Sequence, residues 1–131
     1  MNVQIKLTSA QKNEIILNCL CNSSSFSSNI ELDYSSLEYN ESKQCLKNYA
    51  KRNEVICFED VIMHMLKNGK NFVAKDVEES EEDVPFNLKS MHSNFSLIPF
   101  RFLSEMIQEQ DDADTSDAIL QYLILGDHIY G

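Results

Sequence analysis

The most restrictive feature of this sequence is an apolar stripe at helical spacing near its C-terminal end. The stripe consists of Ile119, Leu120, Leu123 and Ile124. This spacing predicts an amphipathic helix with one face packed on a core. Asp114 or Thr115 is predicted to cap the start of the helix, and Gly126 is predicted to end it in a left-handed conformation.

Other segments have the same helical character. Thr8 and Gln11 have the spacing of a capping box, which predicts a helix beginning at Ser9. The predicted helices run over 9–22, 42–51, 58–68, 88–95 and 99–107. Gly69 is expected to close the third of these, and Pro99 to be the first residue of the last.

Short alternating segments predict strands between these helices. Period-two alternation of apolar and polar residues marks 1–7 and 30–34, and an apolar run marks 72–77. The acidic segment from Glu78 to Asp83 is predicted as a hairpin-like loop before Val84, and residues 127–131 as a tail that adds an edge strand. We therefore expect a single α+β domain over 1–131. It should have a small, about three-stranded, antiparallel sheet, four to six helices and a helix-rich C-terminal half.

The compartment is predicted from what the sequence lacks. No stretch of about 18 apolar residues is present, and the first residues do not have the basic, apolar and small-residue regions of a signal peptide. We therefore expect a cytoplasmic protein, in the host cytoplasm if it is phage-encoded. A reducing compartment disfavours disulfides, so Cys19, Cys21, Cys45 and Cys57 are expected to be free thiols.

Charge is distributed unevenly along the chain. Residues 1–70 contain eight Lys/Arg and eight Asp/Glu, whereas residues 71–131 contain three and thirteen, so the second half carries the whole net charge of −10. Such a field repels nucleic acid and anionic membranes and attracts basic partners. Direct DNA or RNA binding and membrane adsorption are therefore not expected, although solubility alone would also explain the acidity.

Candidate catalytic and metal-binding patterns are weak. The run from Asp112 to Asp117 lacks the Gly and the Glu that a calcium-binding loop needs at its sixth and twelfth positions. The cysteines and His64 do not have zinc-ligand spacing. Cys57 precedes a predicted helix whose positive end could activate a thiol, but nothing in the spacing brings a histidine to it. We therefore expect no catalytic residue, no metal and no cofactor.

The segment from Asp112 to Gly131 carries the one family resemblance. It reads DADTSDAILQYLILGDHIYG, with an Asp-rich cap, a Leu-Gln step and a Gly-Asp-x-x-Tyr-Gly end. In these features it resembles the closing segment of small uncharacterised proteins of phages, prophages and other mobile elements. The resemblance implies a mobile-element setting and assigns no activity or site residue.

The leading hypothesis is a non-enzymatic interaction protein, in its most specific form a phage-encoded inhibitor, whose acidic second half binds a basic, nucleic-acid-binding protein. The carboxylates would stand in place of nucleic-acid phosphates. The predicted protein-binding residues are Glu78, Glu79, Glu81, Glu82, Asp83, Asp111, Asp112, Asp114 and Asp117. The alternatives are a protein that sequesters a small molecule in a pocket and an oligomeric accessory protein, and the sequence does not predict an oligomeric state.

Overall fold

The computed structural model describes residues 6–22, 30–51, 54–76, 83–108 and 113–127. The described helices are α1 (Ser9–Asn22), α3 (Ser36–Tyr49), α4 (Phe58–Lys67), α5 (Leu88–Asn94), the 3-10 turn η1 (Phe95–Leu97), α6 (Phe100–Ile107) and α7 (Ala113–Leu125). The strands are β1 (Ile30–Asp33), β2 (Phe72–Asp76) and β3 (Val84–Phe86), which form one antiparallel sheet in the order β1-β2-β3. The predicted α+β class and the helix-rich C-terminal half are confirmed.

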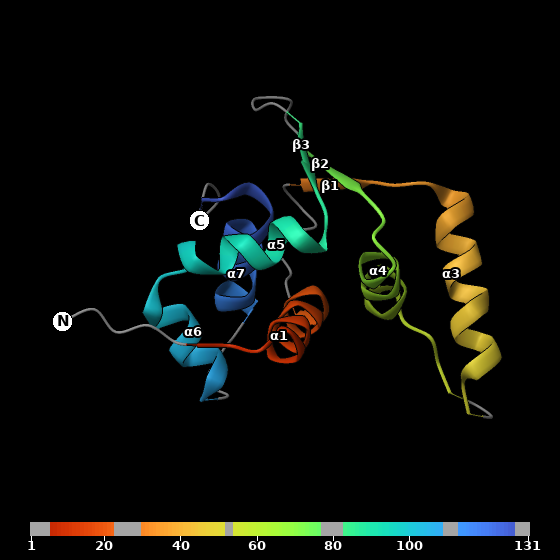
Figure 1. Ribbon diagram of the computed structural model, residues 1–131, viewed down its shortest axis with the longest axis horizontal. Coiled ribbons are helices and arrows are strands. Elements are labelled where there is room, and N and C mark those ends of the chain that lie inside the picture. Colours follow the sequence, from red (N-terminus) through yellow and green to blue (C-terminus); the bar gives the residue numbers. More distant parts are fainter. Residues whose placement is uncertain (1–5, 23–29, 52–53, 77–82, 109–112, 128–131) are drawn as a thin grey trace.

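Helix α7 lies at the centre of the group of helices that also contains α1, α5 and α6. It packs against α1, α5 and α6, while α4 lies between α1 and α3 and the sheet spans one edge (Figure 1). Every side chain from Thr115 to Gln121 is buried, and so are those of Leu123 and Ile124. A helix that is enclosed on nearly all sides belongs to the core. The sequence predicted one buried face, and the structure buries most of the circumference.

The capping residues predicted for the start of α1 and for the ends of α4 and α7 are present in the structure. Thr8 Oγ1 accepts a hydrogen bond from the Gln11 amide (3.1 Å), and Gln11 Oε1 accepts one from the Thr8 amide (2.9 Å). The capping box that was predicted for α1 is therefore present. Gly69 and Gly126 both have a positive φ, 79° and 78°, as expected for residues that close α4 and α7.

Four predicted elements differ from the structure. Helix α7 already includes Ala113, so Asp114 and Thr115 lie in its first turn and do not cap it. Helix α3 begins at Ser36 rather than at Ser42, because the Ser35 side chain caps it by accepting from the Glu38 amide (3.3 Å). Lys6 and Leu7 are not in a strand, and the rest of the strand predicted over 1–7 lies outside the described residues. Pro99 is the residue before α6 rather than its first residue. The predicted edge strand over 127–131 falls almost entirely outside the described residues.

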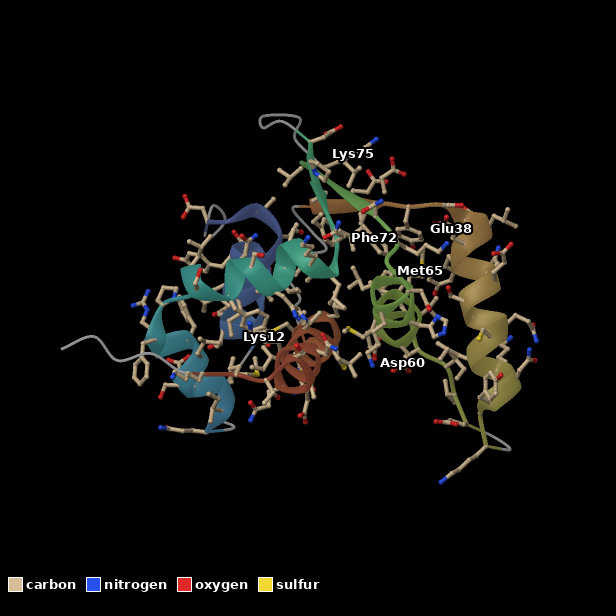
Figure 2. The ribbon with its side chains drawn as sticks, in the orientation of Figure 1. Lys12, Glu38, Asp60, Met65, Phe72 and Lys75 are labelled. Carbon is tan, nitrogen blue, oxygen red and sulfur yellow. The ribbon has the colours of Figure 1, made fainter. Side chains whose placement is uncertain are left out.

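A cluster of aromatic rings joins the sheet to α3 and α4. Tyr34, which follows β1, has its ring centroid 5.6 Å from that of Tyr39 on α3 and 5.6 Å from that of Phe72 on β2. Phe72 also stacks on Phe86 of β3 at 5.5 Å. Figure 2 shows Phe72 between the sheet and Met65 of α4. These contacts fix one face of the sheet on the helices.

No helix in the described part of the chain is both long enough and apolar enough to span a bilayer.

Candidate functional site

The structure separates the nine predicted protein-binding residues into three groups. Asp83 and Asp114 are exposed, and Asp117 is buried. The other six residues lie outside the described part of the chain, namely Glu78, Glu79, Glu81, Glu82, Asp111 and Asp112.

Asp117 does not contribute to a surface. Its side chain is 3% exposed, and its Oδ2 accepts a hydrogen bond from Gln121 Nε2 at 2.9 Å. A carboxylate in the core requires such partners because its desolvation is costly. The inclusion of Asp117 among the exposed binding residues was wrong, because α7 is enclosed at this position.

The two exposed acidic positions, Asp83 and Asp114, do not share one patch. Thr115, in the first turn of α7, donates a hydrogen bond to Glu105 Oε2 of α6 (2.6 Å), which places the start of α7 beside α6. In Figure 1 this region lies at the lower left, whereas β3, which Asp83 precedes, starts at the top. Elements that are apart in one view are apart in space. Asp114 therefore belongs to a different surface from Asp83.

Asp83 lies instead beside the solvent-facing side of the sheet. Side chains alternate along β1 and β2, so Leu32 and Ala74 face the helices while Glu31 and Lys75 face solvent. Lys75 is paired directly across from Glu31, and its Nζ lies 3.3 Å from Asp33 Oδ2.

Three carboxylates act on the charge of Lys75. A hydrogen bond to Asp33 and the charge of Asp33 raise the pKa of Lys75, and the charges of Asp83 and Glu31 raise it further. Glu31, Asp33 and Asp83 together with Lys75 are called the acidic sheet face below. Lys75 is labelled at the upper edge of Figure 2. The Lys75 ammonium group is therefore paired with Asp33 and lies in the field of Glu31 and Asp83.

Sequence reasoning missed Glu31 and Asp33. They belong to the half of the chain whose net charge is zero, and only the antiparallel pairing of β1 with β2 brings them to Asp83. Period-two alternation places Glu31 and Asp33 on the wet side of a strand, but it does not reveal which strand lies beside it. Glu78, Glu79, Glu81 and Glu82 follow β2 and precede β3 in the sequence, and they lie outside the described residues.

Among the described residues, two exposed thiols and one carboxylate lie together in an arrangement that could be considered for catalysis. Cys21 lies in the last turn of α1, Cys57 precedes α4, and Glu59 lies in the first turn of α4. A hydrogen bond to Glu59 raises the pKa of Cys21, and the negative charge of Glu59 raises the pKa of Cys57. The helix N-terminus that could have activated Cys57 is therefore opposed by acidic neighbours. Such thiols are poor nucleophiles at neutral pH.

The described residues contain no group of three or more His, Cys, Asp or Glu side chains arranged to hold a metal ion. His64 is half-buried on α4, and its ring lies 3.1 Å from the side-chain nitrogen of Asn68. His92 is held by Asn13 at 2.7 Å, and burial lowers its pKa, as does the charge of Lys12 to a smaller extent.

A groove of about 480 Å³ lies between the end of α4 and α5. Its lining includes Leu66, Lys67, Leu88, Lys89, His92 and Ser93. The alternative hypothesis of a protein that binds a small molecule requires a concave site. The volume of this groove lies in the range that is usual for such sites.

Comparison with protein families, with curated proteins and with solved structures gave no match for this chain. The resemblance of residues 112–131 to mobile-element proteins therefore stays a prediction. Within that segment the structure describes α7, Gly126 and Asp127.

Proposed function

We propose that this chain is a non-enzymatic interaction protein that binds a basic protein through the acidic sheet face and the Glu-rich segment that lies between β2 and β3 in the sequence. The observation that carries the proposal is the gathering of Glu31, Asp33 and Asp83 around Lys75. If the acidic residues served only solubility, they could be distributed evenly over the surface. A local excess of carboxylates beside a sheet instead favours one orientation of a cationic partner.

The mechanism is electrostatic mimicry of nucleic acid. Glu31 and Asp33 are two residues apart on β1, and Asp83 precedes β3, two strands away, so their backbone positions are separated by roughly 7 to 10 Å. A protein whose Lys and Arg side chains normally contact phosphates would meet negative groups at comparable spacing. Occupation of that surface would block nucleic-acid binding, which is the action expected of a phage-encoded inhibitor.

The acidic residues near the start of α7 have a smaller role in this proposal. Asp114 is exposed but is remote from the acidic sheet face, and Asp117 is buried. Asp114 therefore serves as a matched control for any substitution in the acidic sheet face.

The test is affinity capture from the native host with two tagged forms of the protein, followed by mass spectrometry and calorimetry. One form is the wild type and the other carries Glu31→Gln, Asp33→Asn and Asp83→Asn. We expect the wild type to retain a Lys- and Arg-rich nucleic-acid-binding protein that the triple variant loses, while Asp114→Asn retains it. Affinity should fall steeply between about 0.05 and 0.3 M salt, because screening shortens the range of exposed charges.

Two results would refute the proposal. One is a captured partner that is not basic. The other is binding to a basic partner that is indifferent to salt and to the triple substitution.

A further inference from the structure

We propose that the groove between the end of α4 and α5 binds the phosphate group of a small organic phosphate, a site separate from the acidic sheet face. Its lining is cationic, in contrast to the net negative charge of the chain. The chain has 11 Lys/Arg against 21 Asp/Glu, yet Lys67, Lys89 and His92 line this one groove.

The lysines of the groove, like most described lysines but unlike Lys70 and Lys75, have no carboxylate partner among the described residues. Lys70 lies 3.5 Å from a carboxylate oxygen of Glu38, and Lys75 lies 3.3 Å from one of Asp33. Among the described residues, neither Lys67 nor Lys89 has a carboxylate oxygen within 4 Å. In an acidic protein, two lysines that border the same groove without such a partner create a local positive potential.

Helix stability explains only one of these positions. Lys67 lies in the last turn of α4, where a cation interacts favourably with the helix dipole. Lys89 lies in the first turn of α5, where the dipole disfavours a cation. A ligand anion between them would supply the missing stabilisation for Lys89.

His92 is positioned to report on such an anion. Its Nε2 is held by Asn13 Oδ1 of α1, and its ring packs edge-on against Phe95. Lys12 of α1 lies over the same Phe95 ring, with its Nζ 5.6 Å from the centroid. Among the described residues that line the groove or shift the pKa of His92, the other charged groups are the ammonium groups of Lys12, Lys67 and Lys89.

The size and lining of the groove indicate the ligand class. A volume of about 480 Å³ falls in the range of small-molecule sites. Lysine is a common point-charge partner of phosphate, and the Ser93 hydroxyl can donate a further hydrogen bond. Leu66 and Leu88 contribute apolar surface suited to the organic part of the ligand.

The experiment is a titration of the ¹⁵N-labelled full chain with AMP and with glucose 6-phosphate, using adenosine and glucose as uncharged controls at matched ionic strength. We expect both phosphates, and neither control, to shift the backbone amide signals of Lys89, His92 and Ser93. The imidazole pKa of His92 should rise on binding, because an anion favours the protonated ring.

A pair of double variants makes the result specific. Lys67→Ala with Lys89→Ala should weaken phosphate binding about tenfold or more, since charge-assisted hydrogen bonds are lost. Lys47→Ala with Lys51→Ala removes the same charge from exposed positions at and beyond the end of α3 and should change affinity less than about twofold. Equal weakening in both double variants, shifts spread over the whole surface, or no shift in the groove would overturn the proposal.

Discussion

The Asp117 carboxylate accepts a hydrogen bond from the side-chain amide of Gln121, one helical turn further along α7, and both side chains are buried. Gln121→Ala removes this donor and leaves a small cavity in the most enclosed helix of the protein. We expect a loss of about 2 to 4 kcal/mol in the free energy of unfolding. Gln44→Ala breaks an exposed Gln-Asn hydrogen bond on α3 and should cost less than about 0.5 kcal/mol. Urea denaturation of the two variants gives the comparison, and equal losses would contradict the central placement of α7.

The aromatic contacts between sheet and helices give a second stability prediction. Phe72 is fully buried, whereas Phe58, in the same cluster, is 46% exposed. Phe72→Ala should cost about 3 to 5 kcal/mol. Phe58→Ala should cost roughly 1 kcal/mol, since much of its ring already contacts water. Thermal and chemical unfolding would both show the difference, and a larger effect at Phe58 would mean that Phe72 is not the centre of the cluster.

His92 predicts a pH dependence of stability. Its pKa in the folded protein is lowered from 6.5, first by burial and then by the charge of Lys12. The unfolded chain therefore binds a proton more readily than the folded chain as pH falls below about 6.5, and stability decreases in that direction. His92→Gln can keep a hydrogen bond to Asn13 and does not titrate. The wild type should lose more stability than His92→Gln between about pH 7.5 and pH 5, as measured by unfolding in urea at each pH.

Glu59 predicts the reactivity of two thiols. It raises the pKa of both Cys21 and Cys57, so both are mostly protonated at neutral pH. Glu59→Gln should lower both pKa values and therefore increase the rate of alkylation by iodoacetamide at about pH 8, because the thiolate is the reactive form. Peptide mapping separates these two sites from Cys45. Glu54→Gln is the matched control and should leave the labelling rates unchanged. Faster labelling at Cys45 alone would count against the described arrangement.

Local patterns predicted the fold better than they predicted the site. Helix α1 was predicted with its correct bounds because its apolar spacing and its capping box agree. The beginning of α3 was missed because most of its side chains are polar and only Ser42 is buried, so no apolar stripe marks it. The strands β1 and β2 were recognised from alternation and from an apolar run, which depend on neighbouring residues.

The candidate sites depend on contacts between distant residues. The alternation of apolar and polar residues in β1 does not predict that Glu31 lies across from Lys75. The number of charged residues in a segment does not predict that Asp117 is buried. Lys67 and Lys89 are far apart in the sequence, and only the packing of α4 near α5 brings them to one groove. Asp117 and Gln121 are four residues apart, a spacing that places two side chains next to each other on a helix. This spacing could have predicted that the carboxylate has a partner within its own helix.

The central position of α7 has a consequence for the order in which the molecule is assembled. Helix α1 packs on α7, which lies far along the chain, so this contact cannot form on the ribosome until α7 has emerged. Contacts of such long sequence separation slow folding and leave apolar surface exposed in the meantime. The contact between α1 and α7 is therefore expected to form only after the other described helices have been translated.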